Sequence, residues 1–141
     1  MIEFVNVSAA YDGETPVLHD VSLTVNDGDF VAFVGTNGAG KSTTMRLMNG
    51  LLKPSEGTVL IDGVPTAQLR VSELARRVGF LFQNPDRQIC CQTVREELMF
   101  GFAAQGRADD EAARRVDEVI EQFGFNAQDE PFLLNRGTRQ L

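Results

Sequence analysis

The stretch GTNGAGKS, residues 35–42, decides the fold class of this chain, because it satisfies the pattern G-x-x-x-x-G-K-[ST]. It follows Phe30–Val34, a short continuous apolar run that is typical of a strand buried on both faces of a parallel sheet. A segment with helical periodicity, Lys41–Met48, comes directly after the glycines. The order of strand, glycine loop and helix predicts an α/β fold built around a phosphate-binding loop.

The residue types of this loop suit the binding of a phosphate chain. Glycines let the backbone curl so that successive N–H groups converge on phosphate oxygens, while the following helix presents the positive end of its dipole. Lys41 would pair with the β- and γ-phosphates, and the Ser42 hydroxyl would complete the shell of a magnesium ion. The expected nucleotide-binding residues are Gly35, Thr36, Asn37, Gly38, Ala39, Gly40, Lys41, Ser42 and Thr43.

Two questions stay open at this point: whether the loop binds phosphate at all, and which reaction it serves. A glycine turn that merely joins a strand to a helix could carry similar residues, although the full pattern arises by chance in roughly one chain of this length in a hundred or fewer. Kinases, GTPases and motor ATPases all share the loop. The loop therefore indicates a nucleoside triphosphate and does not identify the reaction.

Further strands are expected on both sides of the loop. Ile2–Val7 and Val17–Val25 alternate between apolar and polar residues, as half-exposed strands do. Thr58–Asp62 is predicted as a third strand, and Val78–Phe82 as a second continuous apolar strand. The strand-rich part of the chain is expected to end near Gln83.

Helices dominate the second half of the sequence. Thr93, followed three residues later by Glu96, forms a capping box that predicts the start of a helix. Asp109–Phe123 is the clearest amphipathic helix, with acids in its first turn and Gly124 just past its end. Earlier in the chain, Ser72 is expected to cap a short helix.

Composition limits the partners and the compartment. The chain has 141 residues and a net charge of −7, which disfavours nucleic-acid binding because no basic face accumulates. No apolar run reaches the roughly 18 residues of a membrane span, and the N-terminus lacks the basic region of a signal peptide, so we expect a cytoplasmic protein. Cys90 and Cys91 are adjacent, and one histidine accompanies them, so we expect small apolar fillers rather than a disulfide or a zinc site.

The stretch GTNGAGKSTTMRLMNGLLKPSEGTVLIDG, residues 35–63, resembles the nucleotide-binding subunit of ATP-binding cassette (ABC) transporters. Tyr11 in AAYDG matches the aromatic residue that stacks on adenine in that family, the alternative being an ordinary surface or core tyrosine. Gln83 in GFLFQNPD matches the glutamine that reaches the magnesium ion and the attacking water in relatives. The run QNPDRQ with the following T-V-x-E-E is similar to the energy-coupling-factor subgroup, which imports vitamins and transition-metal ions.

The sequence LNRGTRQ, residues 134–140, resembles the family signature L-S-x-G-x-x-Q. In relatives this segment starts a helix that holds the γ-phosphate bound to the opposite subunit. Asn135 stands where the family has serine; asparagine still caps a helix and donates an amide N–H, but its side chain is longer. Gly137 keeps the backbone open to close approach. The resemblance adds Asn135 and Gly137 to the expected nucleotide site.

The resemblance implies a partial P-loop NTPase core with an N-terminal antiparallel β subdomain and a helical subdomain. It assigns residues 1–83 to the β subdomain and the P-loop half of the core, 84–135 to the helical subdomain and 136–141 to the start of the signature helix. The implied cofactors are ATP and Mg²⁺, with Ser42 and Gln83 at the metal. The implied partners are a second ATPase subunit and a transmembrane transporter subunit, at the inner face of the cell membrane, and no nucleic acid.

The match covers only the N-terminal portion of the family's domain. Relatives continue past the signature to a strand ending in Asp-Glu and to a switch histidine, whereas only Leu141 follows Gln140 here. We therefore expect this chain alone to bind nucleotide weakly and to hydrolyse it barely or not at all. The leading hypothesis is a truncated transporter ATPase; the alternatives are a non-catalytic module that regulates the transporter and a different P-loop enzyme, such as a small-molecule kinase.

Overall fold

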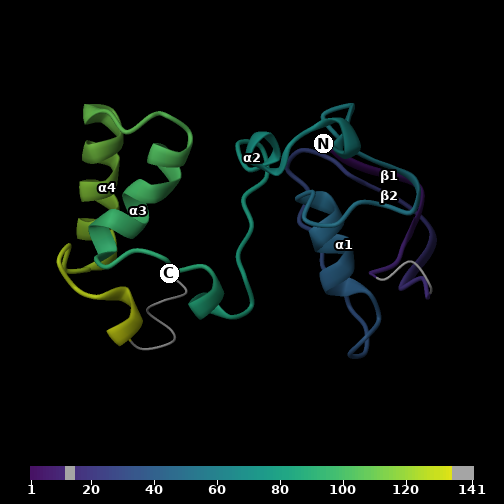
Figure 1. Cartoon of the computed structure of the whole chain (residues 1–141), viewed down its shortest axis with the longest axis horizontal. Helices are drawn as coiled ribbons and strands as arrows, with labels where there is room; N and C mark the ends of the chain where they lie inside the picture. Colours follow the sequence, from purple (N-terminus) through teal and green to yellow (C-terminus); the bar gives the residue numbers. More distant parts are fainter. Residues whose placement is uncertain (12–14, 135–141) are drawn as a thin grey trace. The chain divides into compact units, whose positions relative to one another are not determined.

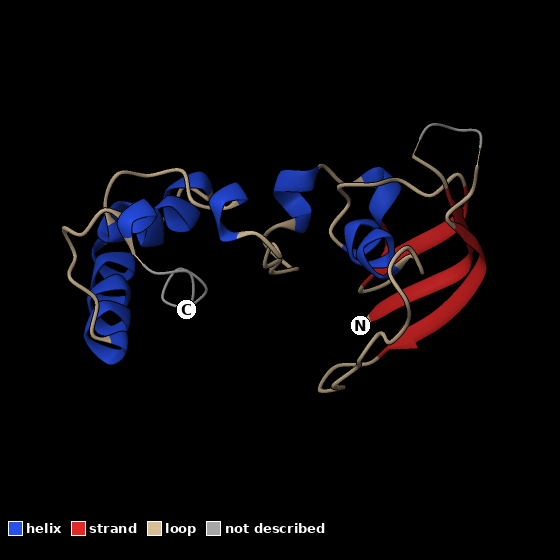
Figure 2. Ribbon diagram, turned by 90° about the horizontal axis from the view of Figure 1, so that it is seen from below, coloured by secondary structure: helices blue, strands red, loops and turns tan. Residues whose placement is uncertain are grey.

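The computed structural model describes residues 1–11 and 15–134, and its contacts divide the chain into two compact units, Met1–Phe80 and Leu81–Leu141 (Figure 1). The described part of the first unit combines a β-sheet with helices, and that of the second unit is helical (Figure 2). Among the described residues, no helix has both the length and the apolar character that crossing a bilayer requires.

The sheet of the first unit is antiparallel throughout. Its strands are β1 (Ile2–Ala9), β2 (Leu18–Val25), β3 (Glu56–Ile61) and the short β4 (Val64–Pro65), in the order β2-β1-β3-β4. The central strand β1 places Ile2 opposite Val25 on one side and opposite Ile61 on the other. The structure therefore confirms the two strands that alternation predicts before the loop and the strand predicted after it.

The core of the first unit lies between this sheet and helix α1 (Lys41–Met48). Leu47 on α1 is fully buried and joins a cluster of buried strand residues: Phe4, Val7, Ala9, Leu18 and Val59. Side chains alternate across a strand, so Phe4 and Val7 of β1 would lie on opposite faces without the register shift that separates them in the pairing with β2. Packing of the helix against this cluster fixes where the glycine loop before α1 is held.

A β-bulge interrupts the pairing of β1 with β3. Val5 pairs with Thr58 and Ser8 with Glu56, so two residues of β1 face the single residue Gly57 of β3. Gly57 has a φ of 74°, and a Cβ atom there would lie 2.1 Å from the carbonyl oxygen of Asn6. Only glycine fits this close approach of two backbones.

The two continuous apolar runs are not strands in the structure. Neither Phe30–Val34 nor Val78–Phe82 is part of the sheet formed by the described residues. Phe30 is 99% exposed, Val34 93% and Leu81 64%. A strand buried on both faces needs neighbouring strands, and the described sheet offers none beside Phe30–Val34. The prediction of two buried strands is therefore wrong for the structure of this chain.

Local capping explains the helices of the second unit, α3 (Val94–Ala104) and α4 (Asp110–Phe123). Thr93 accepts the N–H of Glu96 at 3.2 Å, and Glu96 accepts the N–H of Thr93 at 3.1 Å. Asp109 accepts the N–H of Ala112 at 2.9 Å, and Gly124 ends α4 in the left-handed conformation. The capping box and the amphipathic helix are thus confirmed.

Helix α2 (Val71–Leu74) of the first unit begins earlier than predicted. Arg70 is its N-cap residue, and the Glu73 carboxylate accepts the Arg70 backbone N–H at 2.8 Å. Ser72 lies within the helix and is exposed. The expectation that Ser72 caps this helix is wrong. The N-cap lies two residues earlier, at Arg70, where the Glu73 carboxylate accepts the backbone N–H.

The N-terminal ammonium group ties three segments of the first unit together. It donates to Asp27 at 2.6 Å and to Asp62 at 2.8 Å. Together these hydrogen bonds raise the pKa of the ammonium group to about 10, and the bond to Asp27 contributes more than the bond to Asp62. The same contact with the ammonium group lowers the pKa of the Asp62 carboxyl. The start of β1 is thereby joined to the turn after β2 and to the β3–β4 turn.

Replacement of Gly57 by alanine is expected to destabilise the fold strongly. The added Cβ would meet backbone atoms that cannot move independently, so we expect a loss of about 3 kcal/mol or more in the free energy of unfolding. Gly63 is the matched control, because its φ is 76° and open space surrounds it. Gly63→Ala should lower the free energy of unfolding by only about 1–2 kcal/mol, which is the cost of holding a residue with a Cβ atom in the left-handed conformation. Equal losses in urea denaturation would contradict the close approach at Gly57.

The hydrogen bonds from the N-terminal ammonium group to Asp27 and Asp62 predict a loss of stability at alkaline pH. Because the folded-state pKa is raised from 8.0 to about 10, the contribution is fully present below pH 8 and disappears as the pH rises through 10. Asp27→Asn should reduce the difference in thermal midpoint between about pH 7 and about pH 11. Glu56→Gln removes an exposed acid elsewhere in the unit and should leave that difference unchanged. An unaltered pH profile in Asp27→Asn would disprove the linkage.

Candidate functional site

The glycine loop has a backbone that only its own residue types allow. Gly38 and Gly40 adopt φ values of 87° and 85°, in the left-handed region that other residues avoid. The N–H of Ala39 donates to the carbonyl of Thr36 at 3.2 Å and closes the turn between them. A Cβ on Gly40 would also lie 2.6 Å from Cδ2 of the buried Leu18. The spacing of the motif is therefore a steric requirement of this fold.

Helix α1 begins at the loop with its N-terminus open. Gly40 is the N-cap residue, so no side chain caps the helix, and the first turn contains no acid. The first intrahelical bond runs from the N–H of Thr44 to the carbonyl of Gly40 at 2.9 Å. The N–H groups of Lys41, Ser42 and Thr43 thus have no acceptor within the helix. Such an N-terminus attracts an anion through these donors and through the helix dipole.

The Lys41 side chain folds back over the loop. Its ammonium group donates to the carbonyl oxygens of Gly35 and Thr36, each at 2.7 Å. A cation is therefore held beside the curled backbone and the open helix end. Ser42, the next residue, is exposed at the first turn of α1, where its hydroxyl is accessible. The loop combines a positive charge, backbone donors and a hydroxyl oxygen in seven consecutive residues, Thr36 to Ser42.

The structure brings Tyr11 to the same helix end. Its hydroxyl lies 3.1 Å from Oγ1 of Thr43, which is 4% exposed. Arg46 donates to the Tyr11 hydroxyl at 3.3 Å, and its guanidinium carbon lies 5.7 Å from the ring centroid. The ring remains 47% exposed. Tyr11 is therefore an accessible aromatic residue, tethered to the helix that starts at the glycine loop.

Sequence reasoning did not single out Arg46. It lies three residues after Thr43, so the two share one face of α1, and Tyr11 contacts both. That spacing was the available signal, but it gains meaning only once Tyr11 is known to lie beside the helix. The cation–π contact adds to the hydrogen bond in holding the ring.

Three other predicted site residues, Gln83, Asn135 and Gly137, do not belong to the first unit, which contains the loop. Gln83 belongs to the second unit, where its side chain is exposed, and its role at a metal ion stays a prediction. Asn135 and Gly137 lie outside the residues that the structure describes. The glycine loop and Tyr11 both belong to the first unit.

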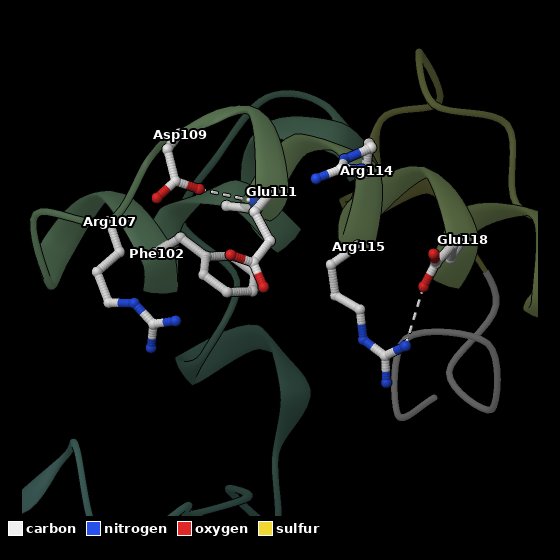
Figure 3. A pocket seen from close by; sticks show the side chains of 8 residues that line it. Phe102, Arg107, Asp109, Glu111, Arg114, Arg115 and Glu118 are labelled. Carbon is white, nitrogen blue, oxygen red and sulfur yellow. Dashed lines mark hydrogen bonds and ion pairs between the residues drawn. The ribbon is translucent and has the colours of Figure 1, made fainter.

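The second unit carries a hollow of about 510 Å³ beside the start of α4 (Figure 3). Two of its carboxylates already have partners within the helix: Asp109 caps α4, and Glu118 pairs with Arg115 at 3.0 Å. Arginines and acids alternate around it, so it lacks the uniform positive charge of an anion site. The lining residues are Phe102, Arg107, Asp109, Glu111, Ala112, Arg114, Arg115 and Glu118. We assign it no binding function.

Comparison with known proteins agrees with this geometry. The model of the family described as ABC transporter matches residues 18–141. The energy-coupling factor transporter ATP-binding protein EcfA1 of Enterococcus faecalis is 38% identical over 144 residues, covering 99% of this chain and 52% of the relative. The chain thus spans about half the length of this relative.

Solved structures show the same fold. The structure of CbiO1 from Clostridium perfringens, part of the ABC transporter complex CbiONQ, superposes with a TM-score of 0.82 at 29% identity, over 99% of this chain and 57% of CbiO1. The dimeric ATP-binding cassette MJ0796, bound to ADP and phosphate, gives a TM-score of 0.81 at 30% identity, over 99% of this chain and 65% of MJ0796. The expected α/β fold of the P-loop NTPase type is confirmed, and this chain belongs to the ABC transporter family of ATP-binding proteins.

Proposed function

We propose that this chain is the nucleotide-binding portion of an ABC transporter subunit and binds Mg²⁺-ATP at the loop of residues 35–42. The observation that carries the proposal is the open N-terminus of α1, with the Lys41 ammonium held at 2.7 Å from two loop carbonyls. An anion that enters the loop meets backbone donors and this cation together. A plain glycine turn would need neither the open helix end nor the lysine.

The residues of the loop fit separate parts of the ligand. Lys41 can exchange its two carbonyl acceptors for β- and γ-phosphate oxygens, which are stronger acceptors because they are charged. The N–H groups from Gly38 to Thr43 follow the phosphate chain. The exposed hydroxyl of Ser42 is a hard oxygen donor of the kind that Mg²⁺ prefers, and the metal would be held there together with phosphate oxygens.

Tyr11 is proposed to receive the base. Its ring is accessible and is held to α1 by Thr43, while Arg46 lies on the ring and supplies a second positive group near the loop. Stacking on an aromatic face is worth about 1–3 kcal/mol per base and discriminates weakly between bases. Tyr11 would therefore add affinity more than it would select adenine over guanine.

The subunit is proposed to work in an energy-coupling-factor importer of a vitamin or a metal ion. Support comes from the 38% identity to EcfA1 and from the structural match to CbiO1. On this proposal, Gln83 contacts the metal ion and water, while Asn135 and Gly137 contact the nucleotide of a second ATPase subunit. Residues 84–135 form the helical subdomain that docks on a transmembrane partner at the inner face of the membrane.

The lysine gives a direct test of nucleotide binding. Lys41→Ala should weaken binding of a fluorescent ATP analogue about 10- to 100-fold, the value of one charge-assisted hydrogen-bonding group. Lys53→Ala is the matched control: its ammonium also donates to backbone carbonyls, those of Thr66 and Leu69, but outside the loop. Circular dichroism of both variants checks folding. Equal affinities in wild type and Lys41→Ala would refute the assignment of the loop.

The close approach of Gly40 predicts a second effect on affinity. Gly40→Ala should push the loop away from Leu18 and weaken binding of the same analogue by roughly tenfold or more, about 1.4 kcal/mol. Gly28→Ala has the same φ of 85° and open surroundings, so it tests the left-handed strain alone. That control should bind the analogue as the wild type does. If both variants lose affinity equally, the contact with Leu18 has no part in shaping the loop.

A further inference from the structure

The two cysteines of the chain point towards each other on the second unit. Their Sγ atoms are 4.0 Å apart, although successive side chains of an extended chain point to opposite sides. The backbone bends at Cys91, between the turn of Pro85–Arg87 and the start of α3. Cys90 is exposed and Cys91 half-buried, so the expectation that Cys90 is a buried apolar filler is wrong. The bend instead offers two thiols on one accessible side.

Glu97 completes the group from the first turn of α3. Its Oε2 accepts the backbone N–H of Cys90 at 2.9 Å and that of Cys91 at 2.8 Å. These two bonds hold the carboxylate beside both sulfurs and leave its other oxygen for a further partner. One ligand atom from each of the three residues lies within 4.8 Å of the others. Two sulfurs and one carboxylate oxygen are therefore already gathered.

The spacing of the sulfurs matches that of two ligands of one tetrahedral ion. With zinc–sulfur bonds of about 2.3 Å, tetrahedral geometry puts two thiolates about 3.8 Å apart. The observed 4.0 Å lies close to this value, and a slightly larger ion would suit it as well. A disulfide would instead require the sulfurs to approach to about 2.05 Å. The present arrangement is thus nearer to metal coordination than to a bond between the two cysteines.

We propose that Cys90, Cys91 and Glu97 form a binding site for a thiophilic divalent cation of the Zn²⁺ and Cd²⁺ class. Thiolate ligands select such soft and borderline ions over Mg²⁺ and Ca²⁺. Two metal–sulfur bonds replace two S–H bonds, and the two protons pass to the buffer. The carboxylate supplies the third ligand, and water completes the tetrahedron. The bound ion would tie the segment that contains Cys90 and Cys91 to α3.

This site shares no residue with the proposed nucleotide site, which comprises the glycine loop, Tyr11, Gln83, Asn135 and Gly137. Both cysteines and Glu97 belong to the second unit, whereas the loop belongs to the first. The metal site also differs in chemistry from the proposed Mg²⁺ position at Ser42, which offers oxygen only. The failure of one proposal therefore leaves the other unaffected.

Cadmium titration of the reduced full chain tests the site. The thiolate-to-cadmium charge-transfer absorption should rise to a plateau at one ion per chain, and the molar mass from light scattering should be the same before cadmium is added and at the plateau. Cys90→Ser and Cys91→Ser should each reduce the plateau absorption by about half, since each removes one of two sulfur ligands. Glu97→Gln should keep the absorption and weaken the affinity about 10- to 100-fold.

The isosteric Glu97→Gln variant separates coordination from positioning. Its amide oxygen can still accept the N–H groups of Cys90 and Cys91, so only the charge and the metal ligand are lost. Glu121→Gln, at an exposed acid of α4 that is not among the three proposed ligands, is the matched control and should bind cadmium as the wild type does. Binding of one ion by two chains, or an unchanged affinity in Glu97→Gln, would overturn the three-residue site. Circular dichroism of every variant confirms that α3 and α4 are retained.

Discussion

The rest of the candidate site depends on the packing of helix α1 against the antiparallel sheet. Leu47 is buried among strand residues of the core, and Gly40 passes close to Leu18 at the start of β2. These two contacts fix both ends of the helix against the same strands. The direction of the helix axis, and with it the direction of its dipole, follows from this packing. The loop before the helix then has little freedom in where it can point.

Electrostatics act within this geometry. The sequence is acidic overall, with a net charge of −7, yet the N-terminus of α1 has no acid in its first turn and carries Lys41 and Arg46 nearby. A local cluster of positive groups on an acidic chain is effective for an anion at short range, because distant charges are screened within about 10 Å at ordinary salt. The net charge of the chain therefore does not predict whether this site binds an anion. The local arrangement of Lys41, Arg46 and the N-terminus of α1 does.

The second unit is organised by side chains that satisfy backbone groups. Thr93 and Glu96 cap α3, Asp109 caps α4, and Glu97 uses one oxygen to hold two consecutive N–H groups before the helix. Acids in first turns suit the positive ends of helices. The same property places a carboxylate beside two thiols. Glu97, which satisfies backbone groups before α3, thus also lies with Cys90 and Cys91 in a group of potential metal ligands.

The sequence by itself determined the features that depend on neighbours along the chain. The glycine spacing of the loop, the capping box of α3 and the amphipathic pattern of α4 rest on contacts within a few residues, and the alternation of β1 and β2 is a pattern of neighbouring residues. For this reason the loop and most of the elements were predictable. The hydrogen bonds of the loop and the helices are local, and so is the periodicity of the strands, so the residue order specifies these features without knowledge of the fold.

Only the tertiary structure decided what depends on distant partners. Phe30–Val34 reads as a buried strand, but a strand exists only where another strand pairs with it, and the described sheet leaves Phe30 exposed. The Tyr11 contact with Thr43 and Arg46, and the clasp of the N-terminal ammonium by Asp27 and Asp62, join residues far apart in sequence. No local pattern encodes such contacts, because they arise from how the elements pack together.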